Sequence, residues 1–258
     1  MQTALTKLQT ASDALKNTSA IAQSKVSSTN TAFSATLASS AAAGSYSVEV
    51  TQLAAAQSLL SPKVGSKDTE LGDSSMSTRT LTITQPGQKD PLTITLASDK
   101  TSLADVRDAI NAKQGSVSAS IIKADDNSYY LALTSRDTGT ANEMTITTDD
   151  SQLAQYVSYN PSSATNVMSE QVPAADAKVN INGIEIVRSS NAITDAPEGV
   201  TLNLTKTNKG SPETLSIVKD NQPMTDAIQA FVDAYNSLQT TIANQTKYTA
   251  DRKSTRLN

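Results

Sequence analysis

Apolar residues recur at alternating spacings of three and four at both ends of the chain. This spacing places a narrow apolar seam along one face of an α-helix, the face that packs against another helix. Each seam covers about two to three heptads, too short for a free-standing coiled coil, so we expect the helices at residues 1–16 and 224–246 to pair with each other. The first seam runs through Met1, Ala4, Leu8, Ala11 and Leu15, and the second through Met224, Ile228, Phe231, Tyr235, Leu238 and Ile242.

The long segment between these helices alternates apolar and polar residues over short runs, a pattern typical of half-buried β-strands. Asn182-Gly183 separates two such runs and predicts a two-residue type I′ hairpin, because both turn residues need positive φ. Ser102 followed by Asp105 is a capping-box pattern that predicts a short helix over 103–110. Strands are expected at 46–51, 80–85, 92–96, 117–122, 129–134, 144–147, 179–181, 184–186, 200–204 and 215–218.

The order of these elements predicts an α+β, β-rich fold. We expect two nested small head domains, one β and one α+β, on a stalk of paired antiparallel leg helices. The Ser/Ala/Thr-rich stretch 18–43 favours an extended or poorly ordered path after the first helix. The expected parts are a leg helix and connector at 1–43, a discontinuous β head domain at 44–77 and 160–218, an inserted α+β domain at 78–159, and a return leg helix at 219–250.

Composition argues against several functional classes. The 258 residues contain no His, Cys or Trp, so triads that depend on His, thiolate chemistry and most zinc sites are excluded. Carboxylate pairs, Ser-Lys dyads and oxygen-ligand Mg²⁺ or Ca²⁺ sites remain possible, but no such site stands out, and we expect neither an enzyme nor a cofactor. The formal net charge is −4 without a Lys/Arg cluster, which argues against nucleic acid as a partner. No apolar run approaches the roughly 18 residues of a membrane span.

Two acidic clusters are the candidates for a Ca²⁺ site. Asp125-Asp126-Asn127 lies between two expected strands, and Asp149-Asp150 follows another. Neither has the alternate-position oxygens, central Gly and terminal Glu of a calcium loop. Asp and Asn are common in turns, so we interpret both clusters as turns and expect no metal site.

A set of segments carries the most specific signal when taken together and in order: 31–36, 46–54, 102–111, 117–122, 179–204, 234–238 and 246–250. This ordered set resembles the bacterial flagellar filament cap proteins, the hook-associated protein 2 family. The resemblance implies a non-catalytic cap of five or six identical subunits, with helical legs reaching the growing end and β domains forming a plate. It also implies export through the flagellar type III system, an extracellular position at the filament tip, and flagellin, the hook–filament junction protein and an export chaperone as partners.

The resemblance also implies that the chain is a fragment. The family has another leg segment before the first helix and continues well past residue 250, so Met1 is expected to be internal. Residues 251–258 match the in-frame reading of a common sequencing adapter, and we expect them to be an artefact.

Two alternatives stay open at this point. A flagellin-like or hook–filament junction subunit would share the helical legs but form part of the shaft. A secreted surface adhesin would need an exposed aromatic platform, for which the best candidates are Tyr129, Tyr130, Tyr156 and Tyr159.

Overall fold

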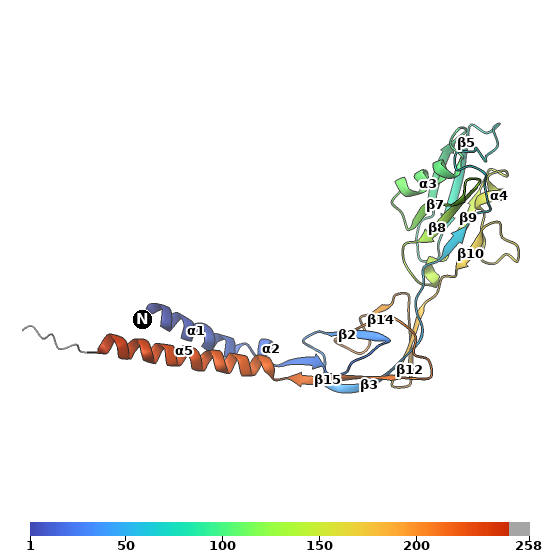
Figure 1. Ribbon diagram of the computed structural model, residues 1–258. Helices are drawn as coiled ribbons and strands as arrows, with labels where there is room; N and C mark the ends of the chain where they lie inside the picture. The colour runs from blue at the N-terminus through green and yellow to red at the C-terminus, as the bar shows by residue number, and fades with distance from the viewer. Residues whose placement is uncertain (248–258) are drawn as a thin grey trace, which may run out of the picture.

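The computed structural model describes residues 1–247, which form an elongated molecule with three successive parts (Figure 1). Helices α1 (Gln2–Lys16) and α5 (Gln222–Thr246) lie side by side and form the leg. A β domain continues from the leg, and an inserted domain rises from the far end of that β domain. No helix among the described residues is long and apolar enough to cross a bilayer.

Local sequence explains where the leg helices begin and end. Asn17 ends α1, and its side-chain oxygen accepts a hydrogen bond from the N–H of Ala20 (3.3 Å), which starts the single turn α2 (Thr18–Ile21). Pro223 lies in the first turn of α5, where its missing N–H costs no intrahelical hydrogen bond. Both leg helices join the β domain at the same end of the leg (Figure 1).

The β domain consists of two antiparallel sheets around one core. The core contains side chains from both sheets, among them Val48, Val179 and Leu202, which are fully buried. The five-stranded sheet has the order β1 (Gln23–Val26), β15 (Glu213–Asp220), β3 (Gly44–Gln52), β11 (Ala177–Ile181) and β12 (Ile184–Arg188). The three-stranded sheet has the order β13 (Ala192–Ile193), β14 (Val200–Leu204) and β2 (Phe33–Leu37).

The inserted domain has its own core, which is built from two further antiparallel sheets and helix α3 (Leu103–Ala112). Ser102 caps α3 by accepting a hydrogen bond from the N–H of Asp105 (3.2 Å), as the sequence predicts. One sheet has the order β10 (Ser169–Val172), β4 (Ser58–Leu60), β8 (Ser128–Ser135) and β7 (Val117–Asp125). The other has the order β6 (Leu92–Ala97), β5 (Thr78–Thr84) and β9 (Thr145–Thr148); the 3₁₀ turn η1 (Thr140–Asn142) and helix α4 (Ala154–Val157) complete the domain.

The stretch 18–43 takes an extended path, which is one of the two expected alternatives, and it is not poorly ordered. It contributes β1, which pairs with β15, and β2, which pairs with β14. Phe33 on β2 is buried in the core of the β domain. The Glu213 carboxylate fixes the turn before β2 by accepting hydrogen bonds from Thr31 N (2.8 Å) and Oγ1 (2.6 Å). The composition did not reveal these two strands, because both find their partner strands far away in the sequence.

The inserted domain is also larger than the expected range 78–159. Strands β4 and β10 pair with each other, and β4 pairs with β8, so the domain extends from β4 to β10. Leu59, Leu71 and Met168 are core residues of this domain. The flanking stretches are polar and rich in turns, and single apolar side chains anchor them to the core. The expected division at residues 44–77 and 160–218 is therefore wrong at both inner boundaries.

The expected artefact at residues 251–258 lies outside the described residues.

Candidate assembly surface and its supports

The leg seam on α1 has the spacing that the heptad pattern predicts. Ala4 and Ala11 are buried, and Leu8 and Leu15 are half-buried against α5. Met1 differs from the expectation, because it is 51% exposed at the end of the helix pair. Alanine at two seam positions lets the helix axes approach closely.

On α5 the face that meets α1 is offset from the expected seam. The buried and half-buried positions run through Ala227, Phe231, Ala234, Leu238 and Thr241, with Ile242 beside them. Met224, Ile228 and Tyr235 belonged to the expected seam, yet they are 42%, 48% and 47% exposed. The helix carries two overlapping heptad registers, and the register with small alanines is the one that packs. The expectation was therefore wrong for those three side chains.

The outward-facing register leaves an apolar stripe on the leg. We call Met224, Ile228, Val232 and Tyr235 the leg stripe; each is more than 40% exposed. Met1 and Leu5 on the same leg are exposed as well, so the leg holds six of the twelve large hydrophobic side chains that are exposed among those whose burial is described. Exposed apolar side chains gathered on one element mark an interaction surface more often than scattered ones do.

An open groove of about 520 Å³ runs between the two leg helices. Small side chains line it from both helices, including Thr10 and Ala14 on α1 and Ala230 and Ala234 on α5. A groove of this kind accepts larger side chains from a further helix. The groove and the leg stripe together make the leg the candidate assembly surface.

The Asn182-Gly183 turn has the geometry that the sequence predicts. Asn182 has φ 51° and Gly183 has φ 87°, and the turn joins β11 to β12 with Ile181 opposite Ile184. The structure adds an attachment that the sequence did not indicate. Asn182 donates its N–H to the carbonyl of Ser47 (2.9 Å), and its side-chain oxygen accepts the N–H of Ser47 (2.8 Å).

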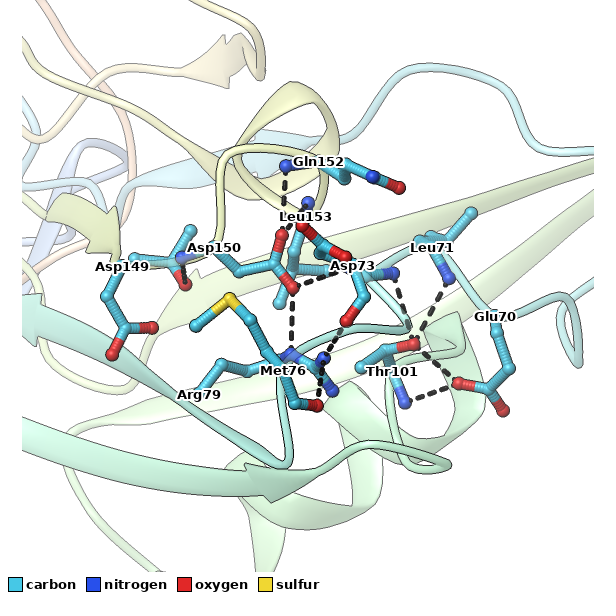
Figure 2. Close-up of polar contacts among 12 residues, drawn as sticks. Glu70, Leu71, Asp73, Met76, Arg79, Thr101, Asp149, Asp150, Gln152 and Leu153 are labelled. Atoms are coloured by element: carbon cyan, nitrogen blue, oxygen red, sulfur yellow. Dashed lines mark hydrogen bonds and ion pairs between the residues drawn. The ribbon is translucent and has the colours of Figure 1, made fainter.

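A fully buried ion pair supports the inserted domain (Figure 2). Arg79 Nε lies 2.8 Å from Asp150 Oδ2, and neither side chain is exposed. Asp150 also accepts hydrogen bonds from the backbone N–H groups of Asp73 (2.9 Å), Gln152 (2.9 Å) and Leu153 (3.1 Å). Burial raises the pKa of Asp150, but the three backbone donors and Arg79 outweigh it, so the pKa is below its ordinary value.

The other end of Arg79 donates hydrogen bonds to three backbone carbonyls. Its Nη1 donates to the carbonyl of Ala97 (2.8 Å), and its Nη2 donates to those of Asp73 (2.6 Å) and Met76 (3.2 Å). A Cβ on Gly72 would lie 2.7 Å from Asp150 Oδ2, so the chain passes very close to the ion pair here. The network attaches the loop before β5 to the core, and its role is structural.

The acidic clusters form turns. Asp125 Oδ1 accepts the N–H of Asn127 (2.9 Å), and Asp150 Oδ1 accepts that of Gln152 in the same way. Within residues 1–247, no group of three acidic, His or Cys side chains could hold a metal ion. The sequence missed the Arg79–Asp150 pair because the two residues lie on strands and loops far apart in the chain.

The tyrosines considered for an aromatic platform are instead part of the inserted domain's packing. Tyr159 is buried, and burial with nearby Glu170 raises its pKa to about 12. Tyr129 and Tyr156 are half-buried against the core, and Tyr130 is half-buried as well. Lys123 lies 5.9 Å from the centre of the Tyr129 ring. This arrangement does not favour the adhesin alternative.

The described residues thus form a helical leg with an exposed apolar stripe, and the leg bears two nested β-rich domains. Family models support a specific assignment. The N-terminal and C-terminal models of flagellar hook-associated protein 2 match residues 1–57 and 174–257, and the flagellin hook IN motif matches 80–137. The chain belongs to the flagellar hook-associated protein 2 family, as its resemblance indicated.

Individual relatives agree with this assignment. Flagellar hook-associated protein 2 of Xenorhabdus nematophila is 41% identical over 95% of this chain and 55% of its own length. The Escherichia coli K12 relative is 41% identical over 97% of this chain and 53% of its own length. The chain thus spans about half the length of the curated relatives it matches.

Solved structures show the same fold. The D1-D2-D3 domains of the flagellar cap protein FliD from Escherichia coli match with a TM-score of 0.79 at 40% identity, over 95% of this chain and 68% of that one. The D2-D3 domains from Serratia marcescens match with a TM-score of 0.69 at 39% identity, over 73% of this chain and all of that one. The α+β, β-rich architecture of nested domains on a helical leg is confirmed.

Proposed function

We propose that this chain is part of a structural subunit that caps the distal end of the bacterial flagellar filament. In that role it promotes flagellin assembly and prevents loss of flagellin to the medium. The observation that carries the proposal is the match to the Escherichia coli cap protein, which includes the leg and both β-rich domains at a TM-score of 0.79. The proposed subunit is not an enzyme, which agrees with a sequence lacking His and Cys.

The physical task of a cap explains the need for legs and a plate. Flagellin that leaves a narrow channel unfolded would diffuse away before it folds onto the filament. A plate standing on legs encloses a small chamber, in which the effective concentration of the subunit is high. The rigid β domains suit the plate, and the leg with its apolar stripe suits contact with the filament end.

The proposed partners follow from the same role. The intact protein forms a homo-oligomer of five or six subunits and contacts flagellin, the hook–filament junction protein and an export chaperone. It is exported by the flagellar type III system and acts extracellularly at the filament tip. The leg stripe of Met224, Ile228, Val232 and Tyr235 supports contact with neighbouring helices. The charge of −4 does not favour nucleic acid as a partner.

Deletion of the intact parent gene tests the proposal. We expect hooks without filaments and monomeric flagellin in the medium, and we expect the intact gene to restore filaments. A gene carrying Ile228→Glu should restore them poorly, because a charge in the leg stripe disrupts apolar contacts. Asn236→Glu, at an exposed polar position of the same helix, is the matched control and should restore them fully.

Other outcomes would contradict the cap role. Normal-length filaments in the deletion strain, together with lost surface attachment, would support the adhesin alternative. The flagellin hook IN motif at residues 80–137 keeps the shaft-subunit alternative worth testing. Gold-labelled antibody should bind only at the filament tip, whereas labelling along the shaft or at its base would support a flagellin-like or hook–filament junction subunit.

A further inference from the structure

The two β-rich domains are joined by a narrow neck. The chain leaves the β domain after β3 and returns before β11, and the two crossings meet at a single bridge between Ala55 and Ala175. Ala55 N donates to the carbonyl of Ala175 (2.8 Å), and Ala175 N donates to that of Ala55 (3.1 Å). The hydrophobic cores assigned to the two domains share no residue. A two-stranded ribbon without a shared core bends easily, so the neck alone does not fix the angle between the domains.

A turn of the inserted domain reaches across the neck and contacts the β domain. Thr140 donates from its N–H (2.9 Å) and its Oγ1 (2.8 Å) to the two carboxylate oxygens of Asp176. Thr138 Oγ1 donates to the carbonyl of Ser189 (2.5 Å), just after β12. Gly139 N also donates to the carbonyl of Ala55 (3.1 Å). These contacts lie beside the two chain crossings and connect the two domains at a third point.

Both sides of this contact are held rigidly within their own domains. On the inserted side, the buried Asn142 donates from Nδ2 to the carbonyl of Thr138 (2.8 Å), and its own carbonyl accepts from Gln85 (2.6 Å) and Ser135 (2.7 Å). On the other side, Asn191 exchanges two hydrogen bonds with the backbone of Ala54 (2.8 and 2.9 Å). Motion at the joint therefore has to break the contact itself.

The backbone at the contact leaves no room for a side chain. Gly139 has φ 102°, a conformation that L residues rarely adopt, and a Cβ there would lie 2.6 Å from Ser189 Cβ. The hydrogen bonds to Asp176 and Ser189 are exposed to solvent, unlike the cores on either side. Exposed hydrogen bonds of this kind open at a far lower free energy than a domain core does.

We propose that residues 138–140 form a latch that fixes the angle between the inserted domain and the β domain, and that releasing the latch lets the inserted domain swing about the neck. The latched state is the one in the structure. The released state keeps both cores intact and moves them as rigid bodies. The latch does not depend on which assembly the protein joins.

Distance measurements between the domains test the latch. The chain has no Cys, so Ala112→Cys on α3 and Glu185→Cys on β12 provide unique sites for two spin labels. Double electron–electron resonance on the full chain should give a narrow distance distribution. Asp176→Ala should broaden it and shift population away from the original maximum. Asp137→Ala removes an exposed acid in the same turn and is the matched control, with no expected change.

Two further variants separate release from unfolding. Gly139→Val forces the latch open sterically, and Thr140→Val removes only the Oγ1 donor and should broaden the distribution less. Hydrogen exchange of the core amides in both domains should stay at the level of the unsubstituted chain. The latch is refuted if Asp176→Ala and Gly139→Val leave the distribution narrow. It is equally refuted if the unsubstituted chain already shows the broad distribution.

Discussion

At the scale of single residues, the Arg79–Asp150 pair is the most consequential feature of the inserted domain. Both charges are fully buried, so each depends on the other and on backbone hydrogen bonds for its solvation. Removing one partner leaves the other as an uncompensated buried charge, which costs far more than the intact pair contributes.

Asp150→Asn should therefore destabilise the inserted domain by about 3–5 kcal/mol. Asp126→Asn removes one partner of a salt bridge to Lys123 in which the carboxylate is 99% exposed, and it should leave stability almost unchanged because solvent screens the pair. Urea unfolding of both variants and the unsubstituted chain measures the difference. Equal, small effects would show that the buried pair is not needed for stability.

The same pair predicts a dependence on pH. The pKa of Asp150 in the folded protein is below its ordinary value of 3.8, so the unfolded chain binds more protons between the two values. The free energy of unfolding should fall as the pH drops below 3.8 and through the folded pKa. At pH values above the pKa of Asp150 in the unfolded chain, its full contribution to the free energy of unfolding is present. Urea unfolding between pH 6 and pH 2.5 should show that the free energy of unfolding falls less with acid in Asp150→Asn than in the unsubstituted chain. Parallel curves for the two proteins would contradict the lowered pKa of Asp150.

The hairpin turn allows a test of backbone strain without steric interference. Neither Gly183 nor Gly65 has an atom within 4 Å of an added Cβ, but only Gly183 has a positive φ. Gly183→Ala should lower the free energy of unfolding by about 1–2 kcal/mol, and Gly65→Ala should leave it unchanged or raise it slightly. Thermal unfolding of the two variants compares them directly. A neutral Gly183→Ala would mean that the turn relaxes to another type.

At the scale of elements, α5 shows that one helix can carry two apolar faces. One face packs against α1 through Ala234 and Leu238, and the other is the leg stripe. Heptad spacing fits both faces, so the pattern identifies the helix but not the face that packs.

Leu238→Ala should weaken the packing of α1 against α5 by about 2 kcal/mol or more, because Leu238 is only 8% exposed at the helix interface. Tyr235→Ala, one turn earlier on the leg stripe, should leave α1 unaffected within the isolated chain. Hydrogen exchange of the α1 amides reports the difference. Faster exchange of the α1 amides in Tyr235→Ala than in Leu238→Ala would mean that α1 packs on the leg-stripe face of α5.

At the scale of the whole molecule, the two cores differ in how the chain builds them. The core of the inserted domain uses residues between Leu59 and Met168 only. The core of the β domain combines the segments 32–54 and 177–217 from either side of the insertion. The inserted domain is thus continuous in sequence, and the β domain is not.

A fragment of residues 57–172 should accordingly fold alone with a single cooperative transition. Residues 174–220 alone should not fold, because they lack β1, β2 and β3, which pair with β15, β14 and β11. Circular dichroism and amide exchange of the two fragments measure this. A structured 174–220 fragment would contradict the mutual dependence of the two halves.

The sequence by itself determined the features that a few neighbouring residues encode. The Ser102 cap, the Asn182-Gly183 turn and the α1 seam each follow from the backbone conformation or spacing of adjacent residues. The larger set of ordered segments was enough to identify the family. The nested arrangement of the two domains was predictable in outline. Helices that pair with each other at the two ends of the chain require the β-rich segment between them to leave the leg and return to it.

Only the tertiary structure decided the features that join distant parts of the chain. Strands β1, β2, β4 and β10 are only three to five residues long, and they exist because a partner strand elsewhere supplies their hydrogen bonds. The Arg79–Asp150 pair, the packing face of α5 and the latch at 138–140 depend in the same way on which surfaces meet. Burial and hydrogen bonding between segments far apart in sequence leave no periodic signal, so only the folded chain shows where they form.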